Sequence, residues 1–473
     1  MSALHEINQN VRNIKPLVSS VLTRRASQIK EELRQGAKKP YKDVIDICWD
    51  DSHRAGVKPL SFVRQVLATC IYPQLMKSDR LPVDVKQRAQ TLLRRCNGGS
   101  VGSYADTDTA EMINSISAFI KRRDGGASAG DIYVTPGSLW SLTTFLTALV
   151  NRGSLRTGVL TPVPGHCATI SVLTGMGAVA APYHLSEEHG WELNVEELRR
   201  ALESAQRTCN PVALYIINPG SPSGHVQSRA SIQEVIRFVS ENKLFLLANE
   251  VYQDCVYGEK RGFVSYKRVL GEMGPPFADT VELASFHSVS KGLTGESGLR
   301  CGYVELVNLD PAVKRCMATV FSLNNCAPTM GQIALDLMLN PPQPGDPSYP
   351  LYEMETQNIW NMLVHNIKRA FEVINGLPNF CCQAVEGGTF TFPRLHLPPK
   401  AIQRAKDMGL EPDTFYCIRL LEEAGLMASP GCENGQKDGT YHIRFSIMTT
   451  EETMEEALRR LSRFHTQFTK DFA

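Results

Sequence analysis

The sequence has 473 residues, 42% of them hydrophobic and 21% charged, which is typical of a folded globular protein and excludes a disordered chain. Its 50 basic residues nearly balance its 49 acidic residues, so the formal net charge is only +1. Charges so evenly matched create no strong field for nucleic acid or an anionic membrane, and we expect neither as a partner. The composition favours a small-molecule ligand.

The 13 cysteines are odd in number and irregularly spaced, and none belongs to a CxxC pattern. This predicts reduced thiols and no bound metal. The sequence has neither a run of 18 apolar residues nor a secretory signal core near Met1, so we expect no membrane-spanning helix. The basic, amphipathic segment 11–34 has features of a mitochondrial presequence, but Glu31 and Glu32 are atypical of one, and a cytoplasmic location is favoured.

From about Asp131 to Leu306, short β-branched runs alternate with longer helical stretches, the pattern of a parallel sheet with crossover helices. The expected strands are Ile132–Thr135, Gly158–Val163, Val212–Asn218, Leu244–Asn249, Val281–Phe286 and Gly302–Leu306. The expected helices between them include Ser138–Val150, Val195–Ala205 and Ser228–Asn242. The sequence therefore predicts an α/β domain with a mostly parallel central sheet.

The proline-rich run Pro341–Pro350 is unsuited to a helix or a central strand and is expected to be a connector. Beyond it the sequence predicts a smaller α+β domain. Its expected elements are a long helix at 353–375, a strand TFTFPRL from Thr389, a helix at 414–424, a strand TYHIRFSIM from Thr440 and a final helix. We expect the large domain at residues 101–340, the small one at 351–473, and a contribution of residues 1–100 to the small domain.

The most informative stretch is SFHSVSKGLTGESGLRCGY, which places Ser288, Ser290, Lys291 and Arg300 directly after an apolar strand. Ligands of such sheets bind beyond the carboxyl ends of the strands. A lysine there can form a Schiff base with an aldehyde, and hydroxyls with a guanidinium suit a phosphate group. A lone loop lysine is more often simply solvated. Ser288 and Lys291 also match the S-x-x-K of penicillin-binding enzymes, but the companion K-T-G is missing and we discount this interpretation.

Three other turns are candidates for the same site. NPGSPSG, residues 218–224, is expected to form a tight turn after a strand. It is not the nucleophile elbow G-x-S-x-G, because Pro222 stands where that motif needs its serine. LFLLANEVYQDCVY puts Asn249 at a strand end with Tyr252 close by. In TPGSLWSL the turn at Gly137 opens a helix, whose free N–H groups can bind an anion. Taken singly, each of these is an ordinary structural feature.

Taken in order, these pieces resemble the fold type I, class I/II pyridoxal-phosphate aminotransferases, and the strings are most similar to those of alanine aminotransferases. Members of that group read NPGNPTG, LLADEVYQDNVY and SFHSTSKGYMGECGYRGGY at three of these places. The resemblance begins at Glu32–Gly36 and KPLSFVRQV from Lys58, continues through GVLTPVP and INPGSPSG, and ends at GTYHIRFSI and LSRFHTQFT. It implies a homodimeric enzyme, with residues 1–100 also contributing to the dimer. The enzyme would use pyridoxal 5′-phosphate to transfer the amino group of L-alanine to 2-oxoglutarate by a ping-pong mechanism.

The resemblance also implies residues that hold the cofactor. Lys291 would form the Schiff base and move the proton between Cα and C4′. Ser288 and Arg300 would bind the phosphate, together with the backbone at Ser138 and the partner subunit's Tyr104.

Two more positions follow from the same resemblance. Tyr252 would hydrogen-bond the phenolic O3′ of the cofactor. Arg444 would bind the substrate carboxylate in bidentate fashion, for which the fixed fork of a guanidinium is better shaped than an ammonium group.

Five positions differ from the family pattern. Asn249 replaces an aspartate, Ser221 an asparagine at O3′, His166 the tyrosine stacked on the ring, Leu139 a phosphate-binding serine, and Asp50 a glycine of the substrate loop. The aspartate keeps the pyridine nitrogen protonated so that the ring accepts the electrons of Cα, whereas an amide carries no charge. Losing such a partner typically costs on the order of 10² to 10³ in rate, so we expect cofactor binding with slow turnover.

Two alternatives therefore accompany the alanine aminotransferase hypothesis. One is a catalytically impaired paralogue that binds the cofactor and has a binding or regulatory role. The other is an aminotransferase for another donor, such as kynurenine, because donor choice depends on the shape of the pocket.

Overall fold

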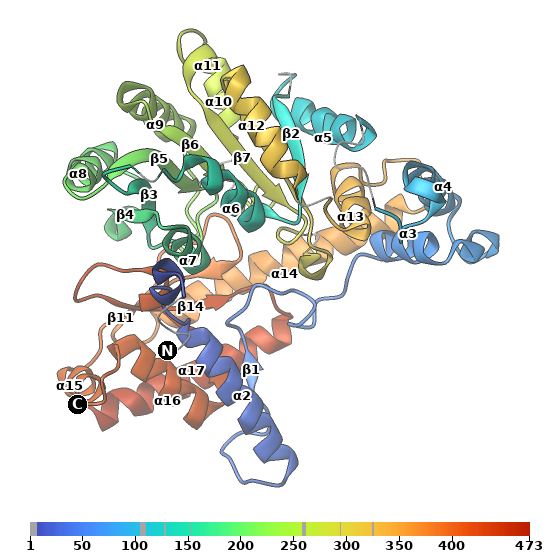
Figure 1. Cartoon of the computed structure of the whole chain (residues 1–473). Coiled ribbons are helices and arrows are strands. Elements are labelled where there is room, and N and C mark those ends of the chain that lie inside the picture. Colours follow the sequence, from blue (N-terminus) through green and yellow to red (C-terminus); the bar gives the residue numbers. More distant parts are fainter. Residues whose placement is uncertain are drawn as a thin grey trace.

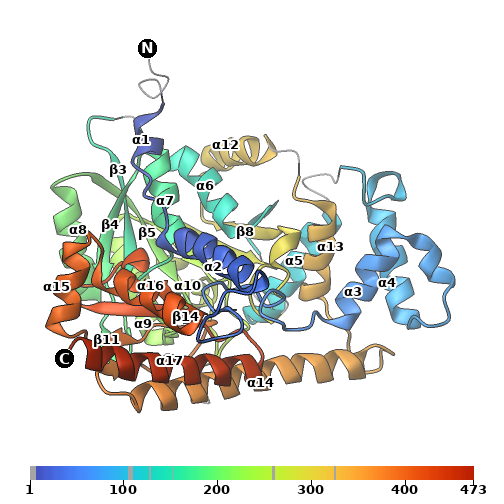
Figure 2. The same ribbon diagram turned by 90° about the horizontal axis from the view of Figure 1, so that it is seen from below.

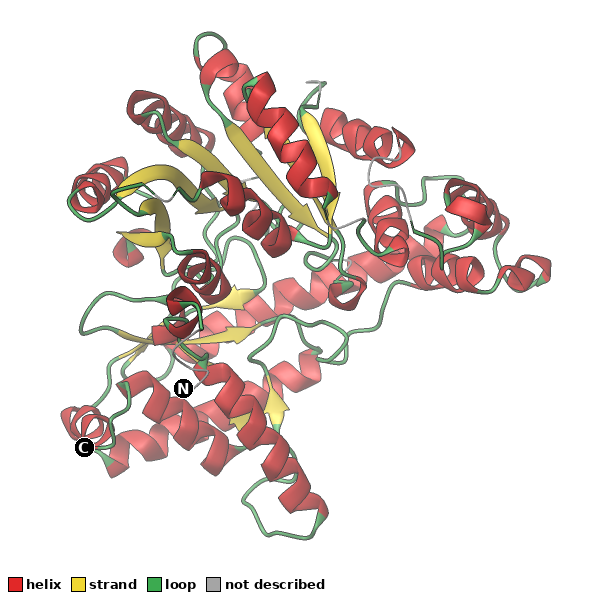
Figure 3. Ribbon diagram, in the orientation of Figure 1, coloured by secondary structure: helices red, strands yellow, loops and turns green. Residues whose placement is uncertain are grey.

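The computed structural model describes residues 7–104, 110–126, 129–151, 153–257, 262–293, 295–323 and 326–473. A broad twisted sheet with helices packed around it occupies one side of the molecule, and a smaller, helix-rich part lies below it (Figure 1). Figure 3 shows that strands are concentrated in these two regions and that helices lie around them. Within the described ranges, no helix combines the length and the apolar content needed to span a bilayer.

The large sheet has seven strands in the order β2-β8-β7-β6-β5-β3-β4. They are β2 (Asp131–Thr135), β3 (Thr157–Val163), β4 (Val179–His184), β5 (Asn210–Ile217), β6 (Phe245–Asn249), β7 (Leu283–Ser288) and β8 (Gly302–Val307). Strand β8 runs antiparallel to β7 and β2, and the pairs formed by the other strands are parallel. The mixed, mostly parallel sheet confirms the predicted fold class.

Two features of this sheet differ from the sequence prediction. The edge strand β4 was missed, because its sequence VAAPYH contains a proline and lacks a run of β-branched residues. Strand β7 begins at Leu283 rather than Val281 and continues to Ser288. Between β7 and β8 the described residues contain only the short 3-10 helix η5 (Ser297–Leu299), which is too little chain for a parallel crossover, so β8 reverses direction.

Helices cover both faces of the large sheet. One face packs against α8 (Val195–Gln206), α9 (Arg229–Asn242) and α10 (Tyr266–Met273), and the other against α6 (Ser138–Leu149), α7 (Cys167–Met176) and α12 (Pro311–Ser322). Successive residues of a strand point to opposite faces, so Leu246 of β6 belongs to the first hydrophobic core and Leu247 to the second. Helices α5 (Ala110–Arg123) and α13 (Thr329–Leu339) pack against the edge formed by β2 and β8.

The smaller part contains a second sheet in the order β10-β14-β11-β9, with β13 also paired to β14. Its strands are β9 (Phe380–Cys381), β10 (Phe390–Thr391), β11 (Arg394–Leu395), β13 (Ser429–Pro430) and β14 (Tyr441–Ser446), and its helices are α14 (Tyr349–Asn375), α15 (Pro399–Asp407), α16 (Pro412–Ala424) and α17 (Glu451–Asp471). The single strand expected from Thr389 is two short ones, because Pro393 between them has no N–H for a ladder. The helix expected from Glu353 begins at Tyr349, since Pro350 in its first turn needs no N–H partner.

The N-terminal helices pack on different regions of the molecule. They are α1 (Gln9–Arg12), α2 (Val18–Arg34), α3 (Ser61–Ile71) and α4 (Val83–Arg95). Helix α2 contacts α16 and β13, whereas α3 contacts α13 and α14. Viewed from below, α14 and α17 lie side by side along one edge, and α3 and α4 lie at the far end of α14 (Figure 2). Strand β1 (Ile45–Asp46) pairs with β12 (Leu426–Met427) and ties the segment between α2 and α3 to the smaller part. The residue bounds of the domains stay a prediction.

Candidate active site

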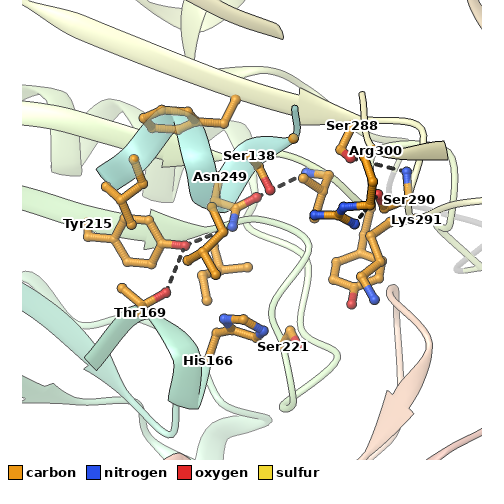
Figure 4. A pocket seen from close by; sticks show the side chains of 17 residues that line it. Ser138, His166, Thr169, Tyr215, Ser221, Asn249, Ser288, Ser290, Lys291 and Arg300 are labelled. Carbon is orange, nitrogen blue, oxygen red and sulfur yellow. Dashed lines mark hydrogen bonds between the residues drawn. The ribbon is translucent and has the colours of Figure 1, made fainter. Parts of the chain in front are cut away.

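A pocket opens where the carboxyl ends of β3, β5, β6 and β7 meet, which is where parallel sheets bind their ligands. Its empty volume, including the open mouth, is about 740 Å³. Its lining includes most of the residues named from the sequence: Gly137, Ser138, Leu139, His166, Ser221, Asn249, Tyr252, Ser288, Ser290, Lys291 and Arg300. Figure 4 shows these side chains, from widely separated segments, around one space.

One end of the pocket is rich in hydrogen-bond donors. Helix α6 begins at Ser138, so the free N–H groups of its first turn are available there. Arg300 Nη1 donates to Ser290 Oγ at 3.4 Å, and the Ser288 hydroxyl is buried close by. A Cβ at Gly137, which has a φ of +120°, would lie 3.5 Å from Arg300 Nη2 and 4.0 Å from Ser288 Oγ. Glycine therefore leaves space between the Arg300 guanidinium and the Ser288 hydroxyl, which here donates to the backbone oxygen of Cys301 at 3.1 Å, and a guanidinium with a hydroxyl suits a phosphate group.

Lys291 forms an ion pair with the carboxylate of Asp50. Its Nζ forms an ion pair with Asp50 Oδ2 at 2.8 Å and donates to the backbone oxygen of Asp50 at 3.2 Å. The Tyr252 hydroxyl donates to the same carboxylate oxygen at 2.9 Å. Burial and the Asp50 charge raise the pKa of Tyr252 well above its usual value, so this hydroxyl stays protonated near neutral pH. Asp50 thus engages both the amine and the phenol of the pocket.

The wall at the end of β6 is neutral. Asn249 Nδ2 donates to the hydroxyl oxygen of Tyr215 at 2.7 Å, and the Thr169 hydroxyl donates to the same oxygen at 3.4 Å. The backbone N–H of Val251 donates to Asn249 Oδ1 at 3.4 Å, which orients the amide with its nitrogen toward Tyr215. Burial raises the pKa of Tyr215, so it is uncharged near neutral pH. This side of the pocket carries no formal charge.

His166 and Ser221 lie below Asn249 in Figure 4. Burial lowers the pKa of His166 to about 4, and the positive charges of Lys291 and Arg444 contribute, so its imidazole is neutral at pH 7. Ser221 lies in the turn after β5, and its buried hydroxyl has no hydrogen-bond partner among the described residues. A buried polar atom of this kind is one that a ligand can satisfy.

Three residues named from the sequence are not among the pocket lining: Asp50, Arg444 and Tyr104. Arg444 lies on β14, where Nη2 donates to the backbone oxygen of Cys48 at 3.2 Å and to Ser429 Oγ at 3.1 Å. Its buried Nε has no hydrogen-bond partner among the described residues. Its positive charge acts on the pocket by helping to lower the pKa of His166. Tyr104 is 74% exposed and does not belong to the pocket of its own chain.

Tyr215 and Thr169 were not predicted as pocket residues. The alternation in VALYIIN puts Tyr215 and Ile217 on the same face of a strand, but it does not indicate which neighbour the hydroxyl contacts. The ion pair between Asp50 and Lys291 joins positions 241 residues apart, which no local pattern could indicate.

Comparison with known families shows to which family the chain belongs. The model of the family "Aminotransferase class I and II" matches residues 66–461, most of the chain. The chain belongs to the class I and II aminotransferases. This aminotransferase is 45% identical to alanine aminotransferase 1 of Bos taurus over 474 residues, covering 99% of this chain and 96% of the relative. It is 44% identical to alanine aminotransferase 1 of Homo sapiens with the same coverage.

A more distant relative and two solved structures extend the comparison. Glutamate–glyoxylate aminotransferase 2 of Arabidopsis thaliana is 36% identical over 99% of this chain and 96% of its own. An alanine aminotransferase from Pyrococcus furiosus has a TM-score of 0.75 at 17% identity, covering 98% of this chain and 100% of that chain. An aspartate aminotransferase from Rhizobium meliloti has a TM-score of 0.73 at 20% identity, with coverages of 97% and 98%. At these identities the structures show the shared fold.

Aminotransferases of this class use pyridoxal 5′-phosphate, and the residues of the pocket match several chemical groups of this cofactor. A phosphate fits the donor-rich end at Gly137, where a side chain is absent between Arg300 and Ser288. The unpartnered Ser221 hydroxyl can hydrogen-bond to the cofactor, and the neutral His166 ring can stack on the cofactor ring. The residues present fit the cofactor, although the wall at Asn249 lacks the charge that the family pattern has there.

Proposed function

We propose that this aminotransferase transfers the amino group of L-alanine to 2-oxoglutarate, giving pyruvate and glutamate by a ping-pong mechanism. The proposal is carried by one observation: in a chain with this nearly full-length similarity to alanine aminotransferases, Lys291 shares a pocket with an anion-binding end. Ser288 and Arg300 supply that end.

The bound cofactor supplies a conjugated ring that accepts the electrons left on the substrate Cα when its proton departs. Ser288, Arg300 and the N–H groups at the start of α6 hold the phosphate. With the cofactor bound, Nζ of Lys291 would move the proton between Cα and C4′, which requires that the ion pair with Asp50 first opens. Tyr252 would donate a hydrogen bond to O3′ once it is released from Asp50.

Arg444 binds the carboxylate common to all amino-acid and 2-oxo-acid substrates. The side chain is buried, and its Nη2 is already oriented by Cys48 and Ser429. The unpartnered Nε gives the guanidinium a free donor, and a carboxylate that binds it with two parallel hydrogen bonds gains orientation as well as affinity.

The half-reaction tests this proposal. Protein loaded with pyridoxal phosphate is mixed with L-alanine in the absence of 2-oxoglutarate, and pyruvate is measured against the number of sites. We expect up to one pyruvate per site, followed by glutamate when 2-oxoglutarate is added. Pyruvate that never forms, even after long incubation, would refute the alanine reaction.

A second candidate function is favoured by the neutral wall at Asn249. Without a carboxylate at this place, the chain would bind the cofactor and turn over slowly, with a binding or regulatory role as its main activity. Cofactor binding combined with a half-reaction several orders of magnitude slower than the typical turnover of about 10 s⁻¹ would favour this candidate.

Another amino donor is the remaining alternative within the enzyme class. The substrate loop carries Asp50 and the ring is faced by His166, so the pocket differs in charge and shape from the family pattern. A panel of donors that includes kynurenine, assayed under the same half-reaction conditions, ranks alanine against the others. A faster reaction with kynurenine than with alanine would replace the donor in our proposal.

Assembly and location complete the proposal. We propose a homodimer in which the exposed Tyr104 of each chain reaches the phosphate end of the other site. Light scattering tests the dimer, and Tyr104→Phe should weaken cofactor retention if the contact forms. We also propose a cytoplasmic location, which the 13 free thiols of the described residues support, because such thiols are typical of reducing compartments. Fractionation of cells tests it.

A further inference from the structure

The ion pair between Asp50 and Lys291 has to open before the transfer reaction described above, and that reaction does not otherwise use it. The Asp50 side chain is 7% exposed and that of Lys291 26%, so the pair is only partly screened by water. One carboxylate oxygen accepts both the Lys291 amine and the Tyr252 hydroxyl, and the backbone oxygen of the same residue accepts the amine again. The nitrogen that must bond an aldehyde is thus already a donor to two oxygens.

The loop that carries Asp50 is fixed on the side facing away from the pocket. The N–H of Ile47 donates to the backbone oxygen of Met427 at 3.1 Å, and the backbone oxygen of Ile47 accepts from the N–H of Ser446 at 2.7 Å. Cys48 Sγ lies 2.6 Å from Ser429 Oγ. The position of this carboxylate is therefore set by the smaller sheet, not by the lysine alone.

The same loop is also attached to the lysine loop. Ser52 Oγ donates to the backbone oxygen of Gly295 at 3.3 Å. A Cβ at Gly295, which has a φ of +58°, would lie 2.4 Å from Ser52 Oγ, so the glycine allows the two loops to approach closely. Asp50 and Lys291 are held together from both sides.

We propose that Asp50 is a positioning residue that restrains Lys291 and so sets how readily this lysine bonds the cofactor aldehyde. The inference rests on the proposed use of pyridoxal phosphate. In the bonding step the ammonium nitrogen replaces the aldehyde oxygen, one water leaves, and the positive charge remains on the new C=N group. The lysine has to leave both oxygens of Asp50 before its nitrogen reaches the aldehyde carbon, and Tyr252 must leave the same carboxylate before it can contact O3′.

Two variants test the restraint, with a matched control. Asp50→Asn keeps the size of the side chain and removes its charge, and Asp50→Gly removes the side chain. Asp51→Asn changes another carboxylate of the same loop. Within the described residues, the Asp51 carboxylate accepts a hydrogen bond only from the backbone N–H of Arg54. Each cofactor-free protein is treated briefly with acetic anhydride, and acetylation is measured by mass spectrometry at Lys291. The buried Lys267 reports unfolding in the same spectrum.

We expect acetylation of Lys291 to become faster by about tenfold in Asp50→Asn, the factor that about 1.4 kcal/mol represents, and by at least as much in Asp50→Gly. Asp51→Asn should match the parent protein. The rate of covalent uptake of pyridoxal phosphate, followed by absorbance and trapped with borohydride, should rise in parallel.

The outcomes separate this inference from the proposed function. Equal acetylation of Lys291 in the parent and in both Asp50 variants, with Lys267 protected throughout, would overturn the restraint. Faster acetylation with unchanged cofactor uptake would overturn its link to the cofactor. Faster acetylation in a protein that takes up no cofactor in any form supports the restraint and refutes the proposed function instead.

Discussion

The amide nitrogen of Asn249 lies 2.7 Å from the hydroxyl oxygen of Tyr215, on the neighbouring parallel strand. The backbone N–H of Val251 fixes the amide orientation, so neither group presents a charge to the pocket. The family pattern has an aspartate at position 249, and a carboxylate there would accept from the Tyr215 hydroxyl instead of donating to it. This contact is one of two places where the charge of the site differs from the family pattern, the other being Asp50.

Asn249→Asp should therefore raise the rate of the alanine half-reaction by on the order of 10² to 10³, because a preorganised charge is restored where it stabilises electron flow into the ring. The rate of pyruvate formation measures the effect. Asn361→Asp, an exposed position on α14, serves as the control and should leave the rate unchanged. A rate in Asn249→Asp no higher than in the parent would show that this wall does not limit turnover.

Leu139→Ser should tighten cofactor binding by about two- to tenfold, since one added hydrogen bond to the phosphate contributes about 0.5 to 1.5 kcal/mol. Leu139 lines the donor-rich end next to Ser138, so a hydroxyl at this place can reach the phosphate. Leu139→Ala removes the side chain without adding a donor and should not reproduce the gain. Equilibrium dialysis against pyridoxal phosphate measures both, and equal affinities of the two variants would contradict the assignment.

Arg444→Lys should raise the KM for L-alanine on the order of ten- to a hundredfold, because an ammonium group cannot reproduce the two parallel bonds of a guanidinium. Cofactor affinity should change much less. Arg394→Lys on the adjacent strand β11, where Arg394 pairs with Glu187 at 3.5 Å, is the matched control. An unchanged KM in Arg444→Lys would place the carboxylate elsewhere.

The pH dependence of stability should contain a contribution from His287. Burial and the charge of Arg123 lower its pKa to about 3, whereas an unfolded histidine titrates near 6.5. Between these values the unfolded chain binds more protons, so the free energy of unfolding falls as pH decreases from about 6.5 to about 3. Phe119 stacks on the imidazole at 6.1 Å, so His287→Phe is a conservative replacement.

In His287→Phe the free energy of unfolding should depend less on pH between pH 7 and pH 5, because up to about one fewer proton is taken up on unfolding. Urea unfolding at the two pH values, followed by circular dichroism and fluorescence, measures it. His189→Phe changes an exposed side chain and sets the baseline. The same slope in the parent and His287→Phe would contradict a neutral buried imidazole.

The sequence was sufficient for the sheet and for the pocket because both follow from local patterns. Six of the seven strands of the large sheet were predicted to within about two residues at their carboxyl ends, and these ends position Asn249, Ser221 and Lys291. Strand β4 was missed because an edge strand with a proline has little β propensity, and the reversal of β8 depends on loop length rather than on strand composition.

The contacts within the site were harder to predict than its members. Asp50 was recognised as unusual from its position, but its partner Lys291 could not be named, because the smaller sheet brings the two loops together. Tyr215 had no motif to mark it, and its hydroxyl is important only through Asn249. Long-range packing determines such pairs, and a single sequence does not contain that information in local form.

Reduction with borohydride in the presence of pyridoxal phosphate, followed by peptide mapping, tests the central claim most directly. The account predicts that the pyridoxyl group is found on Lys291 and that Lys291→Arg, which keeps the positive charge, remains unlabelled. A protein in which Lys291 stays unmodified while another lysine, or none, carries the group would contradict it.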